Sequence, residues 1–169
     1  MLRILVLLLA FPQSTAKPIP ATDVKATDIQ ATVKQEIASS TTDTPIRTVD
    51  AGGNNVSIAV VYRLKGAKGG AAIHDKVTEV YQVLEGAGTL VTGGTMVNPQ
   101  RRASNALEVT QLSGPGVSGT GIQGGVSRRI GKGDMVIIPA GTPHWFSEIQ
   151  ETLTYTVVRL DPSRTVSLK

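Results

Sequence analysis

The sequence contains no cysteine, and only 4% of its 169 residues are aromatic. Without cysteine the chain can form neither a disulfide nor a thiol nucleophile, so its fold must rest on its core alone. Basic residues are scattered apart from the pairs Arg101-Arg102 and Arg128-Arg129, and no aromatic residues are interleaved with them. A nucleic-acid-binding surface would need a clustered basic face, so the net charge of +4 indicates a solvated surface with a mild cationic bias.

The N-terminal segment 1–16 has the features of a secretory signal peptide. Arg3 is followed by the apolar run Ile4–Ala10, and Ser14 to Ala16 provide the small residues that a signal peptidase requires. The apolar run is much shorter than the roughly 20 residues needed to span a bilayer. We expect cleavage after Ala16 and a secreted or periplasmic mature chain with no membrane association; a buried N-terminal strand or helix is the alternative.

The next segment, 17–45, is predicted to be an N-terminal tail with one short helix. The helix is expected over Asp23–Ala38, with Thr22 or Asp23 as its N-cap. Apolar residues recur in it at four-residue spacing and form one apolar edge: Ile29, Val33 and Ile37.

From residue 46 onward the pattern changes to β-structure. Eighteen glycines, and short apolar runs separated by Gly, Pro, Asn and Asp, are typical of a turn-rich all-β domain. A tight turn is predicted at Glu85–Gly88. No internal repeat is present, so residues 46–162 are predicted to form one barrel or sandwich. The expected strands are Ile46–Asp50, Val56–Leu64, Thr78–Leu84, Gly88–Thr92, Leu107–Leu112, Gly125–Ile130, Met135–Ile138, His144–Ile149 and Leu153–Leu160.

The stretch 93–125 is rich in glycine and has one strand-like piece, Leu107–Leu112, in its middle. It is long for a connection between two strands, and such loops are often functional. One interpretation is a loop or extra hairpin that covers one mouth of a barrel. The other is a surface insertion without a role.

Both histidines of the chain belong to patterns suited to metal binding. On a strand, alternate residues face the same side, so Glu79 and Tyr81 share one face, and His144, Phe146 and Glu148 share another. A barrel could bring His74, Glu79 and His144 to one point. Two imidazoles and a carboxylate suit Fe, Mn, Zn, Ni or Cu as divalent ions, and they leave coordination positions open. A buried Glu79 needs a partner, which either a metal or a hydrogen-bonded cluster could provide.

Two segments resemble the motifs of the cupin superfamily. Gly66–Gly86 follows the first motif (Gly, five residues, His, one residue, His, four residues, Glu, six residues, Gly), except that Ala72 stands at the first histidine position. Gly133–Glu148 follows the second (Gly, five residues, Pro, one residue, Gly, two residues, His, three residues, Asn) through His144, with Glu148 where the family often has Asn.

This resemblance implies a single jelly-roll β-barrel that holds a metal through His74, Glu79 and His144. It also implies action on a small, oxygen-rich molecule, by oxygenase, decarboxylase, isomerase or lyase chemistry, and pairing of two chains through sheet edges into a homodimer. The sequence leaves three alternatives open: a metal-free barrel, a non-catalytic module that binds a small ligand, and a structural role.

Four further residues are assigned from strand alternation. Tyr81 is a candidate to hold a substrate oxygen or donate a proton, and Glu148 is a candidate general base. Phe146, in preference to Trp145, is expected to face the barrel interior. Arg159 shares a face with Tyr155 and Val157; if that face pointed inward, Arg159 would bind an anionic substrate, but we expect it to point outward into solvent.

Overall fold

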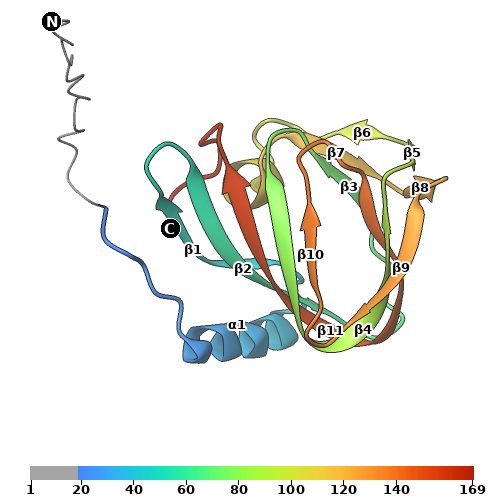
Figure 1. The fold of residues 1–169 in the computed structure, drawn as a ribbon, viewed down its shortest axis with the longest axis horizontal. Coiled ribbons are helices and arrows are strands. Elements are labelled where there is room, and N and C mark those ends of the chain that lie inside the picture. Colours follow the sequence, from blue (N-terminus) through green and yellow to red (C-terminus); the bar gives the residue numbers. More distant parts are fainter. Residues whose placement is uncertain (1–18) are drawn as a thin grey trace, which may run out of the picture.

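The computed structural model describes residues 19–169, so the predicted signal peptide lies outside the described part of the chain. Within that part, one helix precedes a β-barrel (Figure 1), and no helix is long and apolar enough to cross a membrane. The elements are α1 Ala26–Ser39, β1 Thr44–Asp50, β2 Asn55–Arg63, β3 Ala71–His74, β4 Thr78–Thr92, β5 Thr95–Val97, β6 Gln100–Arg101, the π-helix η1 Glu108–Ser113, β7 Gly116–Gly119, β8 Gly121–Gln123, β9 Val126–Gly131, β10 Met135–Ile138 and β11 His144–Asp161.

Two long strands, β4 and β11, organise the barrel. They pair antiparallel from His144 opposite Thr92 to Leu160 opposite Thr78. β11 also pairs with β2 and β3, while β4 also pairs with β9 and β10, so four of the other nine strands pair directly with one of the two. All pairings are antiparallel, and the sheet wraps around an interior. The predicted all-β barrel with a short N-terminal helix is confirmed.

The predicted turn at Glu85–Gly88 is wrong, because the chain continues through it as one strand. Gly86 has a φ of +78°, and a Cβ placed there would lie 2.0 Å from the carbonyl oxygen of Thr152. The register between β4 and β11 shifts at several points near this crossing. Glycine and these bulges therefore bend the two strands around the barrel without reversing them. For the same reason, the two strands expected over His144–Leu160 form one.

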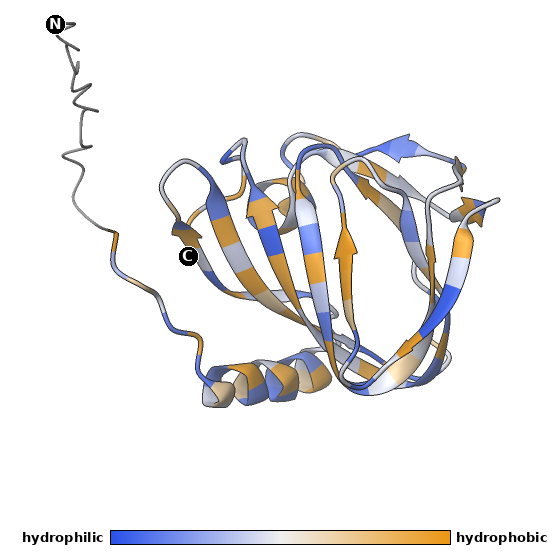
Figure 2. Cartoon of the chain, viewed as in Figure 1, coloured by the Kyte–Doolittle hydropathy of each residue, from blue (hydrophilic) through white to orange (hydrophobic). Residues whose placement is uncertain are grey.

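The core lies between the inner faces of the strands. Figure 2 shows apolar and polar residues alternating along β2 and β4, as expected for strands with one buried face. The buried cluster consists of Ala59, Val61, Tyr81, Val83, Leu90, Ile130, Val136, Ile138, Phe146, Ile149, Leu153, Tyr155 and Val157.

The stretch 93–125 is ordered into short strands and one π-helix. β7 pairs with β3, and β6 pairs with β7, so the stretch extends the sheet beside His74. The predicted strand Leu107–Leu112 is wrong: η1 occupies this region, with Val109 buried and Leu107 exposed. Because Arg102, Leu112 and Ser113 line the main cavity, the stretch covers one mouth of the barrel.

Helix α1 packs on the barrel differently from the prediction. It begins after an N-cap at Lys25, not at Thr22 or Asp23, and the predicted edge residue Ile37 is 54% exposed. Its buried residue is Glu36, whose two carboxylate oxygens have no hydrogen-bond partner among residues 19–169. Burial raises the pKa of Glu36 to about 7, and the neighbouring Thr44 offsets this only in part.

Replacing Glu36 with Gln should stabilise the protein above pH 7. The pKa of Glu36 rises on folding from an ordinary value of 4.5 to about 7, so the folded state binds the extra proton and stability falls as pH increases through this window. Glu36→Gln removes that loss, a gain of about 1–3 kcal/mol at pH 8. Urea unfolding at pH 5 and pH 8 measures it, with the exposed Glu151→Gln as control. Parallel pH profiles for wild type and Glu36→Gln would contradict the assignment.

Candidate metal centre

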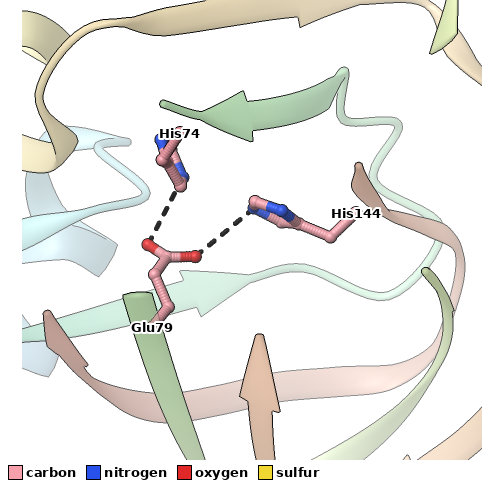
Figure 3. Close-up of side chains that lie close together, drawn as sticks. All are labelled: His74, Glu79 and His144. Atoms are coloured by element: carbon pink, nitrogen blue, oxygen red, sulfur yellow. Dashed lines mark ion pairs between the residues drawn. The ribbon is translucent and has the colours of Figure 1, made fainter. Parts of the chain in front are cut away.

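Three buried side chains from three different strands meet inside the barrel (Figure 3). His74 ends β3, Glu79 lies at the start of β4, and His144 begins β11. Their potential ligand atoms all lie within 4.8 Å of one another. The Nε2 atom of His74 lies 3.5 Å from Oε1 of Glu79, and Nε2 of His144 lies 3.3 Å from Oε2. The predicted convergence of the three residues is therefore observed.

Backbone contacts between the two motif segments fix this arrangement. The amide of Gly141, in the turn before β11, donates a 2.7 Å hydrogen bond to the carbonyl oxygen of His74. His144 stands opposite Ala72 in the β3–β11 pairing. The methyl group of Ala72 lines the cavity where the cupin motif has its first histidine, so the described cluster has three ligand residues.

The prediction for Arg159 is wrong: this side chain points into the barrel and is only 4% exposed. Arg159 stands directly opposite Glu79 in the β4–β11 register, which places both side chains on the same face. Its Nε donates to Oε1 of Glu79 at 2.8 Å, and its two Nη groups donate to Asp43 at 3.1 and 2.5 Å. The guanidinium is thus fully engaged by two carboxylates, and it is the partner that the buried Glu79 requires.

These contacts set the charge state of two ligand residues. Burial acts to raise the pKa of Glu79, but the charge of Arg159, followed by the imidazoles, outweighs it and holds that pKa well below its usual range. Burial lowers the pKa of His144 to about 4. At neutral pH the site therefore offers a carboxylate and a neutral imidazole, the forms that bind metal ions.

Hydrogen bonds on the far side of each imidazole distinguish the two histidines. Nδ1 of His144 lies 3.1 Å from the carbonyl oxygen of Thr142, so that nitrogen donates and Nε2 presents its lone pair to the cluster. Nδ1 of His74 lies 3.3 Å from Nη1 of Arg102. A guanidinium can only donate, so Nδ1 of His74 accepts, and in the neutral ring the proton lies on Nε2, toward Glu79. Without a metal, Nε2 of His74 can therefore donate to Glu79, whereas Nε2 of His144 and Oε2 of Glu79 face each other as two acceptors.

Tyr81 lies next to the cluster, as predicted from its alternation with Glu79. Its hydroxyl donates a 2.8 Å hydrogen bond to Oε2 of Glu79. Burial, reinforced by the negative charge of Glu79, raises the pKa of Tyr81 well above its usual value. The hydroxyl thus keeps its proton and orients Glu79; its role toward a substrate stays a prediction.

Glu148 does not reach the cluster. The β4–β11 register shifts between Phe146 and Glu148, so the next inward-facing residue after Phe146 is Ile149. Glu148 is turned outward and exposed. Simple alternation from His144 failed because it assumed a regular strand. We therefore do not retain Glu148 as general base. Phe146 faces the interior as predicted, and Trp145 also borders the cavity while its indole donates to Gly69.

The cluster opens into a cavity of about 440 Å³. Its wall includes two arginines, Arg63 and Arg102, that the sequence did not single out as site residues. For Arg63 a signal existed, because it continues the inward-facing series Ala59 and Val61 on β2. No comparable signal existed for Arg102, which lies outside any predicted strand.

Replacing Arg159 with Met should destabilise the protein by about 3–5 kcal/mol, because Glu79 and Asp43 would keep buried charges without their partner. Urea unfolding at pH 7 measures the loss. The control is Arg164→Met, which removes an exposed arginine paired with Asp50 and should change stability little. If both variants were as stable as wild type, the Arg159 pair would not be the main support of the site.

No protein-family model matches this sequence, and no curated protein matches it. Among solved structures, a protein from Bacillus halodurans matches with a TM-score of 0.48 and 16% identity, over 85% of this chain and 83% of that one. An oxalate oxidase matches with a TM-score of 0.46 and 20% identity, over 73% of this chain and 52% of that one, so this chain spans about half of its length. KdgF from Halomonas sp. matches with a TM-score of 0.43 and 15% identity, over 68% and 76%.

With TM-scores below 0.5, no activity or substrate is transferred from these proteins to this chain. What this chain itself presents is a pair of segments that resemble the cupin motifs and a buried His/Glu/His group that could hold a metal ion. The two motifs, and the antiparallel barrel that carries them, give this chain the fold of the cupin superfamily.

Proposed function

We propose that this protein holds a divalent transition metal through His74, Glu79 and His144 and acts on a small, oxygen-rich molecule in the adjoining cavity. The observation that carries the proposal is the spacing of the ligand atoms. Metal–ligand bonds of about 2.1 Å at tetrahedral or octahedral angles place neighbouring ligand atoms roughly 3.0–3.4 Å apart. The Nε2–Oε distances of 3.5 and 3.3 Å between the histidines and Glu79 are close to this range.

The state of the ligand residues also supports a metal. Nε2 of His144 is unprotonated and held in place from behind by Thr142. Glu79 is ionised, and its contacts with Arg159 and Tyr81 fix its orientation. Since each carboxylate oxygen has about two acceptor sites, capacity remains for a cation. For Nε2 of His74 to bind a metal, the ring proton would have to move to Nδ1, which now accepts from Arg102. Metal uptake should therefore compete with the contact from Arg102.

A bound divalent ion would supply Lewis-acid polarisation of a substrate oxygen. The chain's own contribution would be enclosure and orientation. One part of the cavity wall is aromatic and consists of Trp145, Phe146 and Tyr155. The stretch 93–125 closes one side of the cavity. A cavity of about 440 Å³ is the size of a small-molecule site. Ala72 leaves room beside His144 where a larger side chain would otherwise stand.

A non-catalytic module that binds a small ligand is the second candidate. It is favoured by the position of Glu148, which is exposed, and by the hydroxyl of Tyr81, which is committed to Glu79. The described part of the cavity thus lacks a free acid–base pair of the kind that proton-transfer enzymes use.

The metal proposal is tested by elemental analysis of the chain from Lys17 onward, after incubation with Fe(II), Mn(II) or Zn(II) and gel filtration. We expect close to one metal ion per chain in the wild type and at least a tenfold lower content in His144→Ala. Glu148→Gln is the matched control, since it changes an exposed residue of the same strand and should retain the metal. Absence of metal from all three proteins would overturn the proposal.

Catalysis and simple binding are separated by a second comparison. An enzyme should lose turnover in His144→Ala while the variant stays folded in circular dichroism. A binding module should show no turnover in the wild type, yet its melting temperature should rise when a ligand is added. A wild type that shows neither turnover nor any ligand-dependent stabilisation would contradict both functions.

A further inference from the structure

Arg63 occupies a position where a strand of this barrel normally carries an apolar side chain. It follows Ala59 and Val61 on the inward-facing side of β2, and both of those residues are buried in the core. Taking a guanidinium out of water is costly unless an opposite charge or a full set of hydrogen bonds compensates it. Arg63 is half-buried, so its partners decide its role.

The contacts of Arg63 with described residues include no ion pair. Its Nε donates a long, 3.4 Å hydrogen bond to the hydroxyl of Tyr155, and its Cζ lies 5.8 Å from the centre of the Phe146 ring. Among residues 19–169, no carboxylate forms an ion pair with it. Arg159, which also faces the interior, has two such partners.

Arg102 also lines the cavity and is in a similar condition. It donates to the hydroxyls of Ser118 at 2.9 Å and Ser113 at 3.3 Å, and it contacts Nδ1 of His74. It too forms no ion pair with a described residue, whereas the adjacent Arg101 is paired with Asp75. The cavity wall therefore includes two arginines that form no ion pair with a described residue and can bind an anionic ligand.

The acidic residues that line the cavity form no ion pair with Arg63 or Arg102. Asp43 and Glu79 are both held by Arg159. The third, Glu108, is exposed on η1. A divalent cation bound at the cluster would add further positive charge and make the cavity more attractive to an anion.

We propose that the cavity binds a small organic oxyanion, and that Arg63 and Arg102 recognise its charged group beside the His74–Glu79–His144 cluster. Guanidinium groups present paired N–H donors that match the oxygens of a carboxylate or a phosphate. The ring of Phe146, over which Arg63 lies, limits the space beside the charged group. This inference rests on the proposed function, because it names the substrate class of the same cavity.

Isothermal titration calorimetry with malonate tests the inference. Malonamide has the same size and shape without the charge, so it should bind at least tenfold more weakly than malonate. Inorganic phosphate is titrated separately: tighter binding of phosphate than of malonate would assign the oxyanion as a phosphate ester, and the reverse would assign a carboxylate. Equal affinity for malonate and malonamide, or no measurable binding of malonate or phosphate, would overturn the inference.

Variants identify the residues. Arg63→Gln should weaken malonate binding about tenfold or more, the size expected for loss of one charge-assisted hydrogen-bonding group. Arg63→Lys keeps the charge but not the paired donors, so its affinity should lie between those of Arg63→Gln and the wild type; it also serves if Arg63→Gln does not fold. Arg128→Gln removes the same charge from exposed strand β9 and should bind as wild type. Unchanged affinity in both Arg63 variants would refute the assignment.

Metal content measured on the same samples separates this inference from the proposed function. Metal without malonate or phosphate binding would leave the metal centre standing and overturn the anion site. Malonate binding that depends on Arg63 in a protein free of metal would support the anion site while overturning the metal centre.

Discussion

The pairing of β4 with β11 is the constraint on which the remaining structure depends. It sets Glu79 directly opposite Arg159, and the ion pair between them is what allows a buried carboxylate to stay charged inside the barrel. The same two strands carry Tyr81 and Tyr155, which pack against each other beside the cluster. A shift of one residue in this register would turn each of these side chains to the opposite face. Fold and site therefore share one origin, the register of two strands that are far apart in sequence.

The interior of the barrel combines two chemistries. Toward one side, aliphatic and aromatic residues form a packed core, while around Glu79 the interior is ionic, and each charged group there is balanced by a neighbour. Arg159 links this ionic part to Asp43, near the end of the N-terminal helix, so the helix region is tied to the site. Arg63 and Arg102 are the exceptions to the charge balance. A charge without an ion-pair partner in a cavity does not stabilise the fold, so it indicates a binding role.

Only part of the His/Glu/His cluster is hydrogen-bonded without a metal. His74 can donate to Glu79, but Nε2 of His144 faces Oε2 of Glu79 with no proton between them, and the ligand atoms stand at distances suited to an ion. Thr142 prepares His144 for metal binding, while Arg102 holds the proton of His74 on the nitrogen that faces Glu79. Arg159 and Tyr81 hold Glu79 in place in the absence of an ion. Metal binding at Nε2 of His74 would move the ring proton to Nδ1, which would break the contact from Arg102.

The sequence by itself determined the all-β class, the helix, most strand positions and the three residues of the cluster, because period-two alternation and the spacing of two motifs are local properties. It did not determine where strands bend. The turn predicted at Glu85–Gly88 and the inward direction of Glu148 were wrong, since bulges and close backbone approaches arise only when β4 meets β11. The strand predicted at Leu107–Leu112 was also wrong, because a π-helix occupies this region. Tertiary structure alone decided the inward direction of Arg159 and the positions of Arg63 and Arg102 in the cavity. The free energy of a buried charge depends on partners distant in sequence, and no local pattern encodes them.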